Sequence, residues 1–326
     1  MHVFKWILFL IQPIIMQHAL AQTCCSGGVP LANNIGGLPI SVKNTWQFSF
    51  GADLNVLTTL KEGTSKLDDR SRERKTLSLL FKTSYSITDK FFIDGLFSWV
   101  QQERIISQPT GFTDYDQTRG LGDAVVLFNY NYFNFKRVKL IAALGPKIPF
   151  GLSNLKDSDG LTLNADLQPG SGAWDGIFLH RIQATGKARP SRLYFANFTY
   201  RYTGVNTEYL GEQDYQFGNE LQLLAGVADQ FLIGTALISV GLNARYRSVR
   251  QDKFNNELLP NTGGNWVFLM PVVGWHIKSN MILSLNGEVP LYANVDGTQL
   301  SPTYRINGGI YYSISKNNQV KKQVNK

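Results

Sequence analysis

Two histidines, His180 and His276, are the residues of the chain best suited to general acid–base catalysis. A hydrolase that used either of them would also need a serine nucleophile and a third group to orient the imidazole. No nucleophile motif accompanies His180, and the chain has no phosphate-binding or dinucleotide-binding fingerprint. We therefore predict no enzyme, no catalytic residue and no cofactor. A hydrolase built around His180 is the alternative.

Metal-binding residues are equally sparse. The only cysteines, Cys24 and Cys25, are adjacent and supply fewer ligands than a tetrahedral metal site needs. They could form a vicinal disulfide or a two-thiol metal pair. The run Asp157-Ser158-Asp159-Gly160 resembles the start of a calcium loop, but the downstream glutamate is missing, so we expect a plain turn. No metal site is predicted.

A third set of candidates consists of charged residues on the polar faces of predicted strands. If these faces enclose an interior, the charges either pair across strands as a structural network or line a solute path. Apolar Val125, Leu127 and Ile141 share the same faces, which favours a narrow path for small, partly apolar molecules over an open sugar or ion pore. The candidates for this path are Asp53, Lys82, Asp94, Asp123, Lys139, Arg201, Glu220, Arg245, Glu288 and Arg305.

The strands that must position these charges are clearest between Gly120 and Phe150. Apolar residues recur there at every second position, for example from Ala124 to Tyr132 and from Val138 to Leu144. A period of two predicts two strands with one apolar face each, joined by a short turn at residues 134–136. The strands are longer than those of most soluble sheets and match the nine to eleven tilted residues that a bilayer requires.

Twelve such strands are predicted between Asn44 and Ile314, and short connections alternate with long ones. This alternation is typical of an outer-membrane barrel with short periplasmic turns and long extracellular loops. We therefore expect an all-β fold: a transmembrane antiparallel up-and-down β-barrel of about 12 strands. Local expectations are a turn at Ala228-Asp229, a bulge at residues 239–241, an interruption at Pro271, and a long loop from Leu291 to Pro302. The alternative is a soluble two-sheet sandwich, which would have to hide rows of Tyr and Phe.

The chain ends predict export. Residues 1–21 read as a signal peptide, with an apolar run from Trp6 to Met16 and a small-residue site at Ala19-Leu20-Ala21. We expect an irregular segment at 22–43 that could plug the lumen, a barrel at 44–315 and a basic tail at 316–326. Four lysines of that tail account for half of the net charge of +8, so the basic pI does not indicate nucleic-acid binding.

Several short motifs resemble one family of outer-membrane barrels. Gly122-Asp123, the run Gly145 to Gly151, the run Leu167 to Asp175, and Glu288 to Tyr292 resemble the meta-pathway phenol-degradation (MetA-like) family, which is similar to the fatty-acid-transporter class. The resemblance implies a protein of the Gram-negative outer membrane that passes small hydrophobic or aromatic solutes by passive diffusion. The expected partners are outer-membrane lipid and a small solute, with no nucleic acid. The alternative is a non-transporting barrel with a structural role, or one that binds a periplasmic protein through Cys24 and Cys25.

Overall fold

The computed structural model describes residues 43–68, 71–107 and 111–315. Over these ranges the regular structure is almost entirely β-strand. No helix in this part of the chain is long and apolar enough to cross a membrane. The predicted signal peptide, Cys24 and Cys25, nearly all of the segment 22–43 and the tail 316–326 lie outside the described residues.

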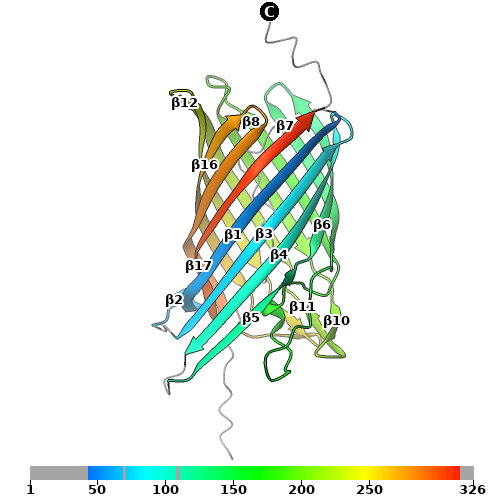
Figure 1. Ribbon diagram of the computed structural model, residues 1–326, viewed down its shortest axis with the longest axis vertical. Coiled ribbons are helices and arrows are strands. Elements are labelled where there is room, and N and C mark those ends of the chain that lie inside the picture. The colour runs from blue at the N-terminus through cyan, green and yellow to red at the C-terminus, as the bar shows by residue number, and fades with distance from the viewer. Residues whose placement is uncertain (1–42, 69–70, 108–110, 316–326) are drawn as a thin grey trace, which may run out of the picture.

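The strands form one closed antiparallel barrel (Figure 1). With β5 and β6 counted as one, eleven labelled strands make up the ring. β17 supplies two strands of the wall, because its first half pairs with β16 and its second half pairs with β1. The wall therefore contains twelve strands, as expected. β5 and β6 both pair with β4 and together form one strand of the wall, broken at Gly122-Asp123. The wall consists of β1 (Thr45–Gly63), β3 (Arg72–Ser86), β4 (Phe91–Ser107), β5 (Thr113–Leu121), β6 (Ala124–Phe135), β7 (Val138–Ile148), β8 (Asp175–Thr185), β9 (Leu193–Tyr202), β12 (Glu220–Ile233), β13 (Ala236–Val249), β16 (Gly264–Lys278) and β17 (Met281–Ser315).

Apolar side chains cover the outside of the wall. Phe50 on β1 and Phe128 on β6 are each 57% exposed, whereas Asp53 on the opposite face of β1 is 1% exposed. Closure pairs the backbone of the wall strands on both sides, as a sheet in hydrocarbon requires, except for β5, which pairs with β4 alone. The apolar outer face and the closed ladder are the features of a transmembrane barrel, and they exclude the two-sheet sandwich.

Connections of two kinds lie at opposite ends of the barrel (Figure 1). At one end five short turns join the strands, at residues 87–90, 136–137, 186–192, 234–235 and 279–280. At the other end the connections are longer and partly structured. There β10 (Asn206–Tyr209), β11 (Gln213–Gln216), β14 (Lys253–Phe254) and β15 (Glu257–Leu258) form a separate four-stranded sheet. By the rule for outer-membrane barrels, the first end is the periplasmic end and the second is the extracellular end.

Three local expectations were wrong and one was right. The turn expected at Ala228-Asp229 lies at Gly234-Thr235, because β12 and β13 stay paired as far as Ile233 and Ala236. The bulge expected at residues 239–241 is absent, since β13 pairs in register with both neighbours there. The residues expected to form a loop from Leu291 to Pro302 are part of β17 and pair with β16 and β1 in the wall. Pro271 does interrupt a ladder: pairing between β16 and β17 skips from Leu269 to Val272.

Candidate functional site

The interior of the barrel near its extracellular end is organised around Asp123, at the break between β5 and β6. One carboxylate oxygen accepts a hydrogen bond from the backbone of Gly151 at 3.1 Å. The other accepts from Lys147 at 2.6 Å and from the backbone and hydroxyl of Ser171 at 3.0 and 2.7 Å. Gly151 and Gly170 touch each other at this point, and a Cβ on Gly170 would lie 2.5 Å from the backbone of Gly151. Asp123 therefore fastens both ends of the connection between β7 and β8 to the wall.

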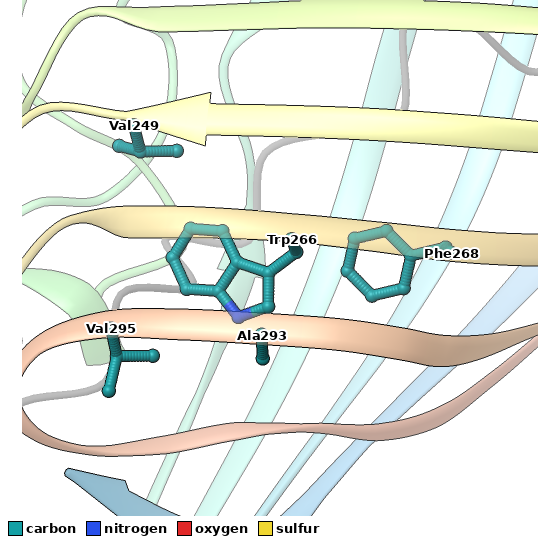
Figure 2. Close-up of a cluster of buried hydrophobic side chains, with 5 residues drawn as sticks. All are labelled: Val249, Trp266, Phe268, Ala293 and Val295. Atoms are coloured by element: carbon teal, nitrogen blue, oxygen red, sulfur yellow. The ribbon is translucent and has the colours of Figure 1, made fainter. Parts of the chain in front are cut away.

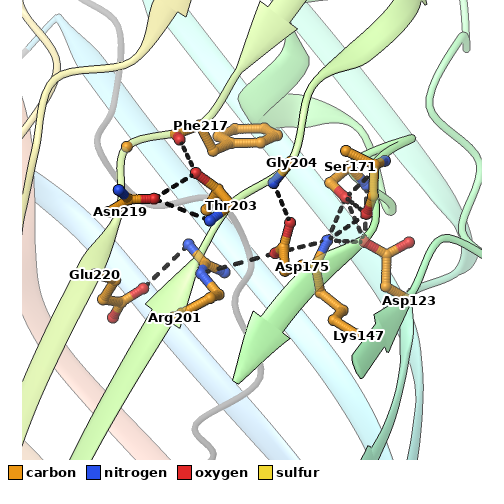
Figure 3. A network of polar contacts seen from close by, with 12 residues as sticks. Asp123, Lys147, Ser171, Asp175, Arg201, Thr203, Gly204, Phe217, Asn219 and Glu220 are labelled. Carbon is orange, nitrogen blue, oxygen red and sulfur yellow. Dashed lines mark hydrogen bonds and ion pairs between the residues drawn. The ribbon is translucent and has the colours of Figure 1, made fainter. Parts of the chain in front are cut away.

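A chain of ion pairs continues from this anchor around the wall (Figure 3). Lys147 also contacts Asp175 at 3.1 Å, and Arg201 lies 3.9 Å from Asp175 and 3.1 Å from Glu220. Glu220 accepts a second contact, at 2.7 Å, from Arg247. Acid and base alternate along β7, β8, β9, β12 and β13, because neighbouring strands bring these side chains into cross-strand register.

Further pairs occupy the rest of the ring. Arg245 binds Glu288 at 2.5 Å, and Arg305 binds both oxygens of Asp53, which also accepts from Asn307. These residues are nearly or fully buried. Burying unpaired charges would be costly, whereas pairs with additional hydrogen bonds hold the wall strands in register. We call the ion-paired residues Asp53, Arg74, Asp123, Lys147, Asp166, Asp175, Arg201, Glu220, Arg245, Arg247, Glu288 and Arg305 the charge belt.

Apolar side chains line the interior between these charges. One cluster next to the charge belt contains Trp266 and Phe268 of β16, which are 0% and 1% exposed (Figure 2). The guanidinium of Arg247 lies over Trp266 and that of Arg245 over Phe268, at 5.3 and 4.6 Å from the ring centres. Two further clusters lie on the inner face: Val125, Leu127, Ala143, Ile177 and Leu179, and Phe195, Leu224, Met270 and Val272.

The connection between β7 and β8 reaches across the mouth of the barrel. Its short 3₁₀ helix, Ala165–Leu167, is buried, and Arg74 of β3 binds the Asp166 carboxylate at 2.5 Å and also the Asp166 backbone carbonyl. Gln102 of β4 donates to the carbonyl of Gln168 at 2.9 Å. We call Arg74, Gln102, Asp166 and Gln168 the latch, because they tie this connection to β3 and β4.

The extracellular four-stranded sheet is fastened by one buried acid. Asp252 accepts hydrogen bonds from the Tyr215 hydroxyl and from the backbone of Gly218, both at 2.7 Å. Burial raises the pKa of Asp252 to about 6, against the hydrogen bonds from Tyr215 and Gly218, which lower it. Burial likewise raises the pKa of Tyr215 well above its usual value. The carboxyl is therefore the group of this sheet whose charge depends on pH near neutrality.

The structure places all ten predicted solute-path residues on the inner face, at strand positions or, for Asp123, at the break before β6. It pairs nine of them: Lys82 with Asp94 at 3.5 Å, and the others as described above. Lys139 is half-buried one residue from the periplasmic end of β7. The sequence analysis missed Arg74, Lys147, Asp166, Asp175 and Arg247. Lys147 and Asp175 stood within quoted motifs, and Arg247 follows Arg245 on the same strand face, so alternation could have found it.

The histidines do not form a catalytic triad. His180 faces outward and shares a 2.7 Å hydrogen bond with the Tyr132 hydroxyl. His276 contacts the Ser239 hydroxyl at 2.6 Å, a pair that the sequence analysis missed. In the described chain neither imidazole pairs with an acidic side chain, and that part of the chain holds no group of three or more His, Cys, Asp or Glu side chains suited to a metal.

Comparison with known proteins identifies the fold. No family model matches the chain, and no curated protein matches it in sequence. The COG4313 outer membrane channel from Pseudomonas putida F1 has a similar structure, with a TM-score of 0.65 and 11% sequence identity over 86% of this chain and 98% of that one. Two more distant likenesses are the beta domain of the Bordetella autotransporter BrkA (TM-score 0.45, 12% identity, 83% and 99% covered) and the CymD monoaromatic hydrocarbon channel (TM-score 0.42, 7% identity, 85% and 90% covered). The chain thus has the closed β-barrel fold of Gram-negative outer-membrane proteins.

Proposed function

We propose that the protein is an outer-membrane channel through which small, partly hydrophobic solutes pass by diffusion. The observation that carries the proposal is the mixed lining of the interior, in which apolar clusters on β6–β8 and on β9–β16 lie between buried, paired charges. A path lined in this way offers an apolar solute contacts along its length, while the paired charges present little net field to a free ion. The structural likeness to an outer membrane channel supports the same role, and the motifs that resemble the MetA-like family agree with it.

The latch provides the experimental test. Arg74→Ala should free the 3₁₀ helix from the wall and widen the mouth, because Arg74 makes the contacts with Asp166 that hold the helix. We expect the variant to pass small solutes several-fold faster than the parent protein in liposome swelling, and to show a larger single-channel conductance.

A matched control is Arg104→Ala. Arg104 forms an ion pair with Asp116 between β4 and β5 and lies outside the latch. This variant should fold and pass solutes at about the parent rate. If neither the parent protein nor the Arg74 variant passes any solute, the protein is not a channel, and a structural or partner-binding barrel would take its place.

A further inference from the structure

Arg181 is a lumen cation that does not belong to the charge belt. It lies on β8, on the same inward face as Ile177 and Leu179, and is 3% exposed. Its Nε and Nη1 atoms have no hydrogen-bond partner, and no ion pair involves it in residues 43–68, 71–107 and 111–315. Burying a guanidinium whose hydrogen-bond donors are unused costs free energy. The site is therefore suited to bind an acceptor group that is not part of the wall.

The neighbours of Arg181 are also incomplete. Its partner across β9 is Asn197, which is 4% exposed and whose Oδ1 atom lacks a hydrogen-bond partner. The oxygen and nitrogen of an amide can exchange places by a rotation, so Asn197 can offer its NH2 to an anion beside Arg181. Two adjacent polar side chains with unused capacity form the recognition end of a site.

The charge around Arg181 favours an anion. The charge belt contains six basic and six acidic residues and is formally neutral. Towards the periplasmic end, Lys82 and Arg181 accompany the acid Asp94, so these three carry a formal charge of +1. Asp94 already binds Lys82 and the Ser84 hydroxyl. It attracts Arg181 electrostatically but does not form an ion pair with it.

Apolar surface flanks the guanidinium on both sides. Ile141 is its partner on β7 and is 1% exposed, and Leu179 belongs to the cluster on β6–β8. Phe195 of β9 belongs to the other cluster. A ligand held by Arg181 and Asn197 would therefore lay its remainder on aliphatic and aromatic side chains.

We propose that Arg181 and Asn197 form an anion-recognition site in the lumen for a small organic monocarboxylate with an apolar body. The planar guanidinium presents paired donors that match the two oxygens of a carboxylate. The proposal rests on the channel function proposed above and adds the charge and the head group of the solute.

Benzoate and benzamide are suitable probes, because they share a ring and nearly the same size and differ in charge. The flux of each would be measured into proteoliposomes containing the full mature protein, with the flux into protein-free liposomes subtracted. The parent protein should pass benzoate preferentially and saturably. Arg181→Gln should lower the ratio of benzoate to benzamide flux about tenfold, and Arg181→Lys should give an intermediate ratio because it keeps the charge without the paired donors.

Arg104→Gln is the charge-matched control, since it also removes one cation and Arg104 lies outside the charge belt and outside the predicted solute path. It should leave the ratio of the two fluxes near the parent value. An unchanged ratio in Arg181→Gln, or an equal fall in Arg104→Gln, overturns the site while the channel stands. An equal rise of both fluxes in Arg181→Gln also overturns it, because Arg181 would then have been holding part of the chain itself.

A second measurement separates this site from the channel. If the parent protein passes neither probe, the channel proposal fails, and calorimetric titration of benzoate into the detergent-solubilised protein decides the site alone. Benzoate binding that Arg181→Gln loses and Arg104→Gln keeps supports the site. The absence of benzoate binding to the parent protein overturns it. A gel shift between heated and unheated samples confirms that each variant is folded.

Discussion

Neighbouring residues on one strand of this protein face different surroundings. On β6, Phe128 is 57% exposed on the outside, and its neighbour Leu127 is 6% exposed inside, within an apolar cluster. Because successive side chains of a strand point to opposite faces, one position decides whether a side chain meets lipid or the lumen. The charges of Lys147 and Arg245 on the inner face each meet an acidic partner.

The lipid-facing assignment predicts the effect of a charge at Phe128. Phe128→Arg should reduce the free energy of folding in a bilayer by about 2–4 kcal/mol, the cost of an arginine on the lipid face near mid-depth. Phe135→Arg is the control, since Phe135 is equally exposed but ends β6 at the periplasmic turn, where the cost falls to about 0–1 kcal/mol. Denaturant titration in lipid vesicles measures both. Equal stability of Phe128→Arg and the parent protein would contradict the assignment.

At the scale of elements, the extracellular connections behave as structured parts and not as free loops. The connection between β7 and β8 is fixed at its base by Asp123 and at its tip by Arg74. The four-stranded sheet buries Tyr209 and Tyr215 against Ala165 of that connection, and Asp252 joins its strands to Gly218. The width of the barrel mouth therefore depends on the contacts that fix this connection and on those that Asp252 makes in the four-stranded sheet.

The fastening at Asp252 should respond to pH. Its pKa in the closed sheet is about 6, whereas an exposed aspartate titrates near 3.8, so the closed sheet binds a proton that the open one releases between these values. The closed state is thus most stable below about pH 4, and it loses at most about 3 kcal/mol of stability as the pH rises through about 6. Hydrogen exchange of residues 253–259, followed from pH 4 to 8, should become faster at the upper end beyond its intrinsic pH dependence.

Two variants distinguish this titration from a general loosening of the sheet. Asp252→Asn cannot ionise and should remove the pH dependence. Tyr215→Phe removes only the hydroxyl that donates to Asp252, so it should weaken the sheet at every pH and retain the dependence. An unaltered pH profile in Asp252→Asn would show that another group is responsible.

The whole molecule is stabilised by closure and by its solvent. The wall strands pair on both sides, except for β5, which pairs with β4 alone, and β1 joins β17 from Thr45–Ser315 to Gly63–Val295, across the full length of the chain. Removal of lipid or detergent would expose an apolar outer surface far larger than a soluble protein tolerates.

Closure and the apolar surface predict the behaviour of the purified protein. The mature chain should require detergent to stay monodisperse, and it should migrate differently on a denaturing gel before and after heating, because the closed barrel resists unfolding in detergent. Gel filtration with and without detergent checks the first point and a paired gel the second. A monodisperse protein in plain buffer would contradict a transmembrane barrel.

The sequence by itself determined the barrel, its apolar outer face and the sorting of short and long connections, because these follow from a period of two that each strand carries locally. It also placed the ten predicted charges on the inner face. Only the tertiary structure decided which charges pair, since Asp53 and Arg305 are 252 positions apart and meet only when the ring closes. The inward course of the connection between β7 and β8, and Arg181 with unused donors, likewise depend on register across several strands. Both faces of β8 carry apolar side chains, with Ile177 and Leu179 inside and Phe178 and Ile182 outside, so the alternation that works elsewhere could not assign Arg181 to the lumen.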